Sequence, residues 1–465
     1  MYQLPITLTH VCRTWRKLFI SCSSLWTYLD LKNVDKTRTF IQRSKSSPLD
    51  IRLEYIGGRD YSDDDPAFSL VVPHIPRVKR LAIYGDCLPA ILEHFRYHPL
   101  LLEGLHFGIS IDAFDPPLDH SLSEVDLSSV RQLGLSGVTT YLPWRNLKNL
   151  KTIRLVSCFA GLTVTRLLDF FESTPLLENI TLGDLLTDLP DASPGRTVRL
   201  PHLRTLVISS PSTPPLLLRH LGIPAGASLF LGFNSSGERS PLVDILSEGS
   251  PNLENLSHIT TINLRFHLEQ KFVQLSGPSG SLCVYIYWKD WTTISYAMED
   301  EILRSLSPSI LSTNERLAIS QYTHLNRAQA DGFLIFTTLS YMDSLRTLSL
   351  VECNLLPFVL ALDPENNMSK SVTCPRLEEL LLYIRSRDRF HMACLVIMAK
   401  NRASKGVKLS SITMVGSGEI AFEGDVFQLR EHVTNVRCMV GGPPTWDDLA
   451  CGRIVGTRRL VVHPG

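Results

Sequence analysis

The sequence repeats a short stretch of alternating apolar and polar positions, and each copy contains two aliphatic residues separated by one variable residue. Examples are VKRLAI, LKTIRL, LENITL, LRTLVI, LRTLSL and LEELLL. Such alternation predicts a short strand with one buried face. The first aliphatic residue of the pair is Leu81, Leu105, Leu133, Ile153, Ile180, Leu206, Ile262, Leu348, Leu380 or Ile412. We expect the first six to be buried on successive, neighbouring, parallel strands.

The segments between these strands carry apolar residues at helical spacing. They comprise residues 88–95, 164–171, 241–246, 301–306 and 392–400. Parallel strands need crossover connections of about a dozen residues or more. The first copies recur every 20 to 28 residues and the last copies every 32, whereas a leucine-rich repeat has about 20–29 residues. The pattern therefore predicts an α/β fold, an irregular leucine-rich-repeat solenoid of parallel strands with helical crossovers.

An open, doubly wound parallel sheet is the alternative that fits the same order of strands and helices. Such a sheet usually places a glycine-rich phosphate turn after its first strand. The sequence contains no such turn, because Gly416-Ser417-Gly418 lacks the third glycine, and the solenoid is favoured. Between 208 and 340 the repeat is less regular. There we expect strands at 229–233 and 282–288 and a turn at 277–280.

The N-terminal part of the chain has a different pattern. Its apolar residues predict one amphipathic helix over Leu8–Phe19. An extended segment at 25–31, a helix at 35–44 and a strand at 49–55 are expected to follow. We predict that Trp15 and Trp26 pack together in one small N-terminal core.

These N-terminal residues resemble the F-box-like proteins that are abundant in mushroom-forming fungi. The resemblance rests on "LTHVCRTWRKLFISCSSLWTYLDL" and "RTFIQRSKSSPLDIRL", and it covers about the first 55 residues. The matching positions are Val11, Cys12, Arg13, Trp15, Arg16, Leu25, Trp26, Arg43, Ser44, Lys45, Ser46, Pro48 and Leu49. Leu4-Pro5 echoes the start of an F-box but no Glu follows it, so we expect an N-terminally incomplete F-box.

The resemblance implies a division into a partial F-box-like segment at 1–47 and a repeat array at 48–465. It also implies a substrate receptor of an SCF (Skp–cullin–F-box) ubiquitin ligase, with an SCF adaptor and an unknown protein target as partners. The adaptor would contact Leu8, Val11, Cys12, Trp15 and Leu18. Because the F-box is expected to be incomplete, we predict that the chain as written binds the adaptor weakly or not at all.

A target would bind the outward-pointing residues of the strands, since every second residue of a strand faces away from the core. The candidates are Arg80, Tyr84, His106, Arg154, Asn263, Arg265, Glu379 and Tyr383. Arg, Tyr and His mixed with polar residues suit a protein-binding surface. A solvated strand face with no ligand has the same composition, so this alternative stays open.

Composition narrows the classes of partner. The chain has 46 Lys+Arg against 46 Asp+Glu, whereas nucleic-acid binding requires a basic footprint. No apolar run is long enough to span a membrane and the first twenty residues do not form a signal peptide. We therefore predict neither a nucleic-acid nor a membrane partner, and a cytoplasmic or nuclear location. The ten cysteines are expected to be reduced.

The search for catalytic and metal-binding motifs gives no candidate. The His10–Cys12 and His391–Cys394 pairs do not supply the four ligands of a structural zinc, and Cys12 is expected to be a buried thiol. Nucleophile-elbow and phosphate-loop motifs are absent. We predict that the protein is not an enzyme and holds no cofactor or metal. Two alternatives remain: a repeat scaffold without a ligase role, and an enzyme or small-molecule binder on an open α/β sheet.

Overall fold

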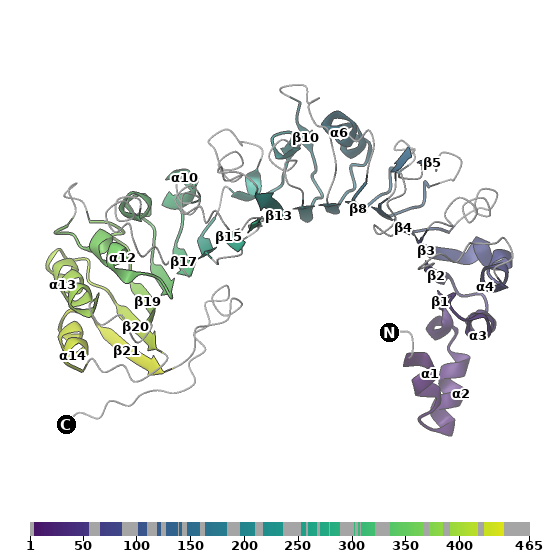
Figure 1. The fold of residues 1–465 in the computed structure, drawn as a ribbon, viewed down its shortest axis with the longest axis horizontal. Helices are drawn as coiled ribbons and strands as arrows, with labels where there is room; N and C mark the ends of the chain where they lie inside the picture. The colour runs from purple at the N-terminus through teal and green to yellow at the C-terminus, as the bar shows by residue number, and fades with distance from the viewer. Residues whose placement is uncertain are drawn as a thin grey trace. The chain divides into compact units, whose positions relative to one another are not determined.

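The computed structural model of the chain has a mixed α/β architecture dominated by a large, mostly parallel sheet (Figure 1). It describes residues 4–54, 66–85, 101–108, 119–121, 127–137, 139–141, 147–158, 163–183, 196–209, 217–235, 253–256, 259–266, 270–278, 280–288, 302, 306, 308–320, 335–366, 372–384, 391–416 and 423–440. The chain divides into two compact units. The first comprises Met1–Thr213 and His220–Gly222, and the second Pro214–Arg219 and Ile223–Gly465.

The strands of the first unit follow the chain in order, and each pairs in parallel with the next. They are β1 (Tyr28–Asp30), β2 (Leu49–Glu54), β3 (Val78–Tyr84), β4 (Gly104–Gly108), β6 (Gln132–Ser136), β8 (Thr152–Val156), β9 (Asn179–Gly183) and β11 (Thr205–Ser209). Two short parallel pairs lie outside this row: β5 (Asp119–Ser121) with β7 (Thr139–Tyr141), and β10 (Val198–Arg199) with β12 (Leu221–Gly222). This order without hairpins is the one that crossover connections produce.

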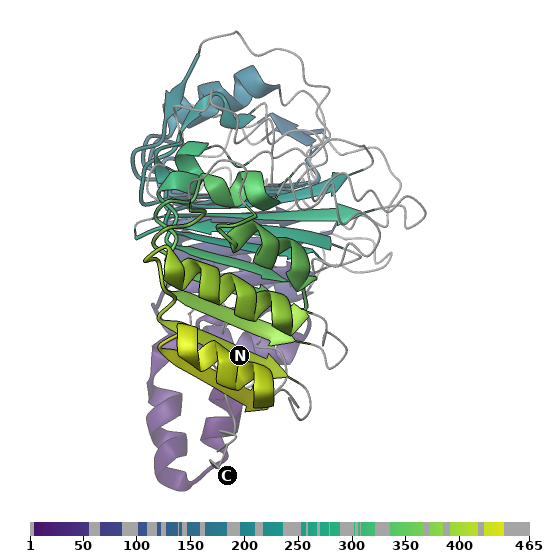
Figure 2. The ribbon, with the colours of Figure 1, turned by 90° about the vertical axis from the view of Figure 1, so that its left-hand side faces the viewer.

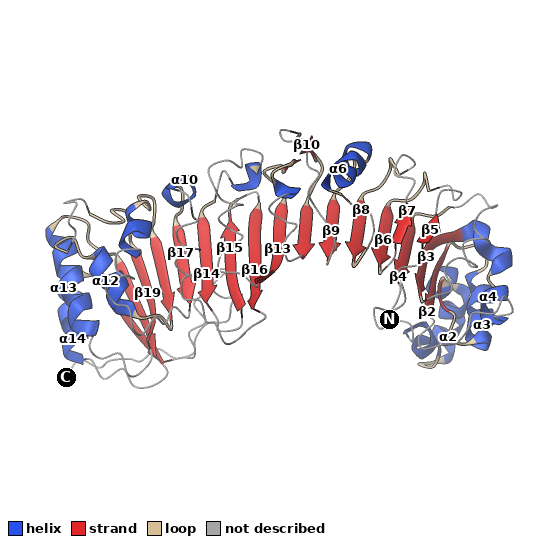
Figure 3. Ribbon diagram, turned by 45° about the horizontal axis from the view of Figure 1, so that its top comes forward, coloured by secondary structure: helices blue, strands red, loops and turns tan. Residues whose placement is uncertain are grey.

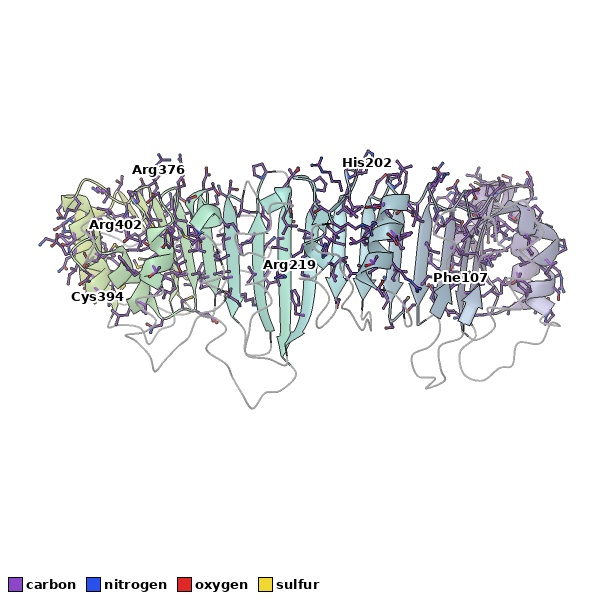
Figure 4. The ribbon with its side chains drawn as sticks, turned by 90° about the horizontal axis from the view of Figure 1, so that it is seen from above. Phe107, His202, Arg219, Arg376, Cys394 and Arg402 are labelled. Carbon is purple, nitrogen blue, oxygen red and sulfur yellow. The ribbon has the colours of Figure 1, made fainter. Side chains whose placement is uncertain are left out.

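The core of the first unit consists of the aliphatic pairs of the repeated phrase. Leu81, Leu105, Leu133, Ile153, Ile180 and Leu206 are all buried, and they are register partners from strand to strand. The prediction for these six residues is therefore confirmed. The second aliphatic residue of each pair forms the next buried row, and Phe107 in β4 belongs to it (Figure 4).

The helices of the first unit lie on one face of its sheet (Figure 1). They are α3 (Val34–Ser44), α4 (Pro66–Ser69) and α6 (Val164–Ser173), with the 3-10 helices η1 (Ser23–Trp26) and η2 (Val72–Arg77). The expected helices at 35–44 and 164–171 correspond to α3 and α6. Side-chain N-caps mark the start of both helices. Asn33 accepts a hydrogen bond from the Lys36 N–H at the start of α3 (2.9 Å), and Thr163 accepts one from the Arg166 N–H at the start of α6 (3.2 Å).

The N-terminal helix differs from the prediction, because the segment Leu8–Phe19 is divided between α1 (Leu4–Thr9) and α2 (Arg13–Ser21). Cys12 is extended and its Sγ caps α2 by accepting a hydrogen bond from the Trp15 N–H (3.5 Å). The Arg16 Nε donates to the Thr9 carbonyl at the end of α1 (2.9 Å). The two contacts satisfy the Trp15 N–H and the Thr9 carbonyl at the break. In a single continuous helix these groups would form hydrogen bonds within the helix.

The predicted packing of the two tryptophans is wrong for Trp15 and right for Trp26. Trp26 has no exposed surface, whereas Trp15 is 43% exposed. The break between α1 and α2 is the physical reason, because α2 then stands apart from the sheet and contacts α1. The predicted boundary at 47/48 falls between β1 and β2, and these two strands pair.

The second unit combines parallel strands with one antiparallel hairpin. Its strands are β13 (Ser228–Ser235), β14 (Thr261–Phe266), β15 (Gln270–Ser276), β16 (Ser281–Trp288), β17 (Arg316–Ser320), β18 (Thr347–Val351), β19 (Glu379–Ile384), β20 (Ser411–Gly416) and β21 (Asn435–Val440). The row runs β13-β16-β15-β14-β17-β18-β19-β20-β21 (Figure 3). The antiparallel partners of β15 are β14 and β16, because only a few residues connect these strands, too few for a crossover.

The predicted strands at 229–233 and 282–288 lie in β13 and β16, and a turn joins β15 to β16 with the Gly277 N–H donating to the Gly280 carbonyl (2.9 Å). The helical segments are η4 (Glu254–Leu256), α10 (Pro308–Ser312), α12 (Leu355–Leu362), α13 (His391–Ser404) and α14 (Glu423–His432). Helices α12, α13 and α14 follow one another side by side on one face of the sheet (Figure 2). The helix predicted at 392–400 is α13; those predicted at 88–95 and 241–246, and most of 301–306, lie outside the described residues.

A fully buried arginine, Arg402 of α13, ties the last helices to the sheet (Figure 4). Its Nη1 donates to the Thr373 carbonyl and its Nη2 to the Cys374 carbonyl, both at 2.9 Å. Burial lowers the pKa of Arg402, and burial also raises the pKa of the neighbouring Cys374 thiol to about 12. We interpret the cluster as structural, because both Nη atoms donate to main-chain carbonyls, two of them just before β19 and a third at the end of α12 (Leu362, 3.4 Å).

Candidate protein-binding surfaces

Exposed apolar residues lie on α2 and just before its N-cap. Val11 is 58% exposed, Leu18 61% and Trp15 43%. Trp15 and Leu18 are three residues apart in α2 and so lie on one side of the helix, and Val11 precedes its N-cap. We call these three residues the α2 surface. Single exposed apolar residues are ordinary, but a contiguous set that includes a tryptophan is typical of an interaction site.

The other two predicted adaptor contacts flank this surface. Cys12 is exposed rather than buried, so the expectation of a buried thiol is wrong; its sulfur caps the helix. Leu8 of α1 is half-buried. The Trp15 ring packs edge-on against Phe19 with 5.6 Å between ring centroids, which fixes the orientation of the indole on the helix.

Trp26 joins α2 to the rest of the first unit. Its indole Nε1 donates to the Phe19 carbonyl in α2 (2.8 Å), and its ring packs edge-on against Phe40 of α3 at 5.0 Å. The Arg43 guanidinium lies over the same indole, 4.3 Å from the ring centroid. Trp26 and Arg43, which are far apart in the sequence, thus meet in one contact. Trp26 is therefore a buried residue that attaches α2, and with it the α2 surface, to the rest of the first unit.

The second candidate surface is the face of the first sheet that lies opposite its helices, which we call the open face. Arg80, Tyr84, His106 and Arg154 all stand on it, at positions that alternate with the buried rows of β3, β4 and β8. Arg80 and Arg154 are exposed and the other two are half-buried. Strand register brings these four predicted residues onto one face of one sheet.

Three of these side chains lie over glycines of the adjacent strand. A Cβ built on Gly134 would come within 2.0 Å of His106 Nδ1, and one on Gly108 within 2.7 Å of the Tyr84 ring. A Cβ on Gly104 would lie 3.2 Å from the Arg80 side chain. The glycines thus leave room for larger side chains to lie flat on the main chain, a role that the sequence analysis did not identify.

The acidic residues of the open face gather on its first strands. Asp50 of β2 approaches Arg80, with 3.5 Å between Oδ2 and Nη1. Glu54 of β2 is paired with Lys32 and Arg52. The hydrogen bond from Lys32 is the main cause that lowers the pKa of Glu54. These charged residues were missed as site candidates; the alternation of LDIRLE is the signal that would have placed them on this face.

The candidates in the second unit are less accessible. Asn263 is 2% exposed and donates from Nδ2 to the Gln274 Oε1 (3.1 Å), and Tyr383 is 8% exposed. The expectation that these two residues offer solvent-exposed surface is therefore wrong, because side chains of the neighbouring strands pack against them. Arg265 is half-buried, and Glu379 is exposed and accepts a hydrogen bond from the Thr347 hydroxyl (3.3 Å).

Tyr383 packs with Val351 and Val415 in an apolar cluster, which Met439 extends. These four residues are register partners on β18, β19, β20 and β21. The second unit thus has a buried apolar row at outward positions of its last four strands.

Other kinds of site were sought among the same residues. In the part of the chain that the structure describes, no three His, Cys, Asp or Glu residues lie close enough to hold a metal ion together. No described helix has the length and apolar character needed to cross a membrane. Comparisons with models of known protein families and with curated proteins found no match for the chain.

Proposed function

We propose that the chain is an irregular leucine-rich-repeat solenoid that serves as a substrate receptor of an SCF-type ubiquitin ligase, with no catalytic role of its own. The observation that carries the proposal is the exposed α2 surface at one end of a row of parallel strands. An adaptor would cover the α2 surface, and a protein target would bind the open face of the first unit. The resemblance of the N-terminal residues to F-box-like proteins supports the same assignment.

The α2 surface can supply part of an adaptor interface. Complete burial of an aliphatic side chain contributes about 1.5–3 kcal/mol, and roughly half of each side chain in this surface is still available for burial. The three residues together therefore offer about 3 kcal/mol. Stable interfaces bury about 800 Å² on each partner, more than one short helix provides. We expect a Kd in the micromolar range or weaker for the chain with a purified Skp-type adaptor.

The test is a titration of the full chain with the adaptor by biolayer interferometry. Leu18→Ala should weaken binding several-fold, because it removes half-exposed apolar area without touching the core. Lys17→Ala on the same helix is the matched control, since it shortens an equally exposed side chain outside the apolar surface. Binding that is insensitive to Leu18 would remove the α2 surface from the proposal.

A repeat scaffold without a ligase role is the second candidate, and the packing of Trp26 favours it. Trp26, Phe40 and Arg43 bury the end of the first unit beside β1, which is the part that a capping segment plays in repeat proteins. If the adaptor does not bind the chain at all in the same titration, the scaffold becomes the better assignment.

A further inference from the structure

Charge is segregated along the open face of the first unit. From β3 to β11 its outward positions carry Arg80, His106 and Arg154, and they include no Asp or Glu. The carboxylates of this face, Asp50 among them, stand on β1 and β2. Since Asp50 already approaches Arg80, the uncompensated cationic part of the face lies farther along, at β4 to β8.

His106 and Arg154 form the centre of this region. The Cα partner of Arg154 in the neighbouring strand is Gly134, and the Cα partner of Gly134 in the next strand is His106. The imidazole lies on the Gly134 main chain, in the strand beside Arg154. Burial is the main cause that lowers the pKa of His106, and the charge of Arg154 is near enough to lower it further. Arg154 is exposed, and among the described residues no carboxylate lies within ion-pair distance of it.

The uncharged neighbours on this face can form hydrogen bonds. Gln132 and Ser136 flank Gly134 on β6, and Thr152 and Thr181 lie beside Arg154 on β8 and β9. Amide and hydroxyl groups of this kind bind peptide main chains and carboxylates. A surface with two cationic groups, polar neighbours and the half-buried Tyr84 ring has the composition of a peptide-binding site.

We propose that the open face between β3 and β8 binds an acidic peptide segment, with a Glu or Asp carboxylate held between Arg154 and His106. This inference rests on the proposed function, because it names the chemistry of the target. An acidic peptide is the occupant whose charge complements the cationic groups of this face. A polynucleotide is a poorer fit, because binding to a phosphate backbone depends on many cationic contacts and this face offers two arginines and one histidine.

Protonation should strengthen the complex. Burial, and secondly the charge of Arg154, lower the pKa of His106 in the free protein. On the flanking strands the ionisable neighbours are Arg80 and Tyr84 of β3, and β6 contributes none. A bound carboxylate favours the imidazolium, so binding takes up a proton. The affinity should therefore rise as the pH falls from about 8 to about 6, a range in which Glu stays ionised.

The first experiment measures fluorescence anisotropy of a labelled peptide of alternating Glu and Ser with the full chain. The matched peptide of alternating Gln and Ser should not bind. Arg154→Gln should weaken binding about tenfold, the effect of one charge-assisted hydrogen bond. Arg131→Gln, which removes the same charge just before β6 and outside the outward positions of that strand, should change binding less than twofold. Equal losses for both variants would show a nonspecific charge effect and overturn the proposal.

A second pair of variants tests the geometry without changing charge. In Gly134→Ala the new methyl group would displace the His106 ring, whereas in Gly183→Ala it would meet the Val156 side chain, whose nearest atom lies 3.3 Å away. Gly134→Ala should therefore weaken peptide binding and flatten its pH dependence, and so should His106→Gln. Gly183→Ala should do neither. A pH dependence that survives His106→Gln would also overturn the proposal.

The outcome is separable from that of the adaptor experiment. If the chain binds the adaptor through the α2 surface but not the Glu-Ser peptide, the acidic-peptide inference fails and the proposed function stands. If it binds the peptide but no adaptor, the ligase role fails and the binding site remains. Tighter binding of a single-stranded oligonucleotide than of the peptide would identify a phosphate-backbone ligand and refute the acidic-peptide site.

Discussion

Replacement of Trp26 tests how α2 is attached to the first unit. The residue has no exposed surface, its indole N–H donates to the Phe19 carbonyl at 2.8 Å, and its ring contacts Phe40 and the Arg43 guanidinium. Trp26→Ala removes all of these contacts, whereas Trp26→Phe keeps an aromatic ring in the core and removes the indole donor. The two variants therefore separate the packing from the hydrogen bond.

The contacts set the expected magnitudes. Truncation of a buried Trp to Ala costs about 3–5 kcal/mol, and the edge-on aromatic pair and the cation–π contact place Trp26→Ala at the upper end, about 5 kcal/mol. Trp26→Phe loses one hydrogen bond, about 1 kcal/mol, and the smaller ring adds a cost of similar size. The loss for Trp26→Phe should therefore be about 2 kcal/mol, concentrated at α2.

Amide hydrogen exchange followed by mass spectrometry resolves these effects locally. Trp26→Phe should speed exchange in α2 while α3 changes much less, and Trp26→Ala should speed exchange in both. Trp15→Phe is the matched control, because Trp15 is partly exposed and its replacement should alter stability by about 0.5 kcal/mol or less. If Trp26→Phe leaves exchange in α2 unchanged, the indole hydrogen bond does not hold the helix and our reasoning is wrong.

Three further predictions concern stability and thiol chemistry. Ile153→Ala should cost about 2–5 kcal/mol and speed amide exchange chiefly in the strands beside β8; a uniform effect across the unit would contradict a repeat architecture. Glu54, whose folded pKa is lowered chiefly by the hydrogen bond from Lys32, should stabilise the fold above its unfolded pKa of about 4.3 and lose this contribution as the pH falls. Denaturant titrations from neutral to acidic pH should therefore show a shallower loss for Glu54→Gln, and identical curves would refute the pairing. A thiol reagent should label exposed Cys12 in the native protein and Cys374, with a pKa raised to about 12 by burial, only after unfolding; rapid native labelling of Cys374 would contradict its burial.

The repeated strands could be predicted because their pattern is local. The alternation around Leu81 or Ile153 indicates which face of the strand is buried. The length of each connection indicates that consecutive strands are parallel. The antiparallel strand β15 was not predicted, although Val273 and Leu275 form the same aliphatic pair as the repeated phrase. The turn at 277–280 was predicted, and a strand on each side of so short a turn indicates a hairpin.

Other features depend on information that a local pattern does not contain. The thiol of Cys12 caps α2, although cysteine is not among the usual capping residues, so the break in the helix was missed. Alternation places Asn263 and Tyr383 on an outward face but does not reveal that side chains of the neighbouring strands bury them. The contact of His106 with Gly134 requires the register of two strands whose pairing residues are far apart in the sequence.

The central claim is that the chain links an SCF adaptor to a target, and assembly with purified components tests it most directly. The full chain, a Skp-type adaptor and a cullin should be mixed well above the measured Kd and examined at that concentration by sedimentation velocity ultracentrifugation. We predict a complex with the mass of one copy of each, which Leu18→Asp abolishes by placing a charge in the exposed α2 surface. Absence of the complex with the unaltered chain, or its persistence with Leu18→Asp, would contradict the proposed function.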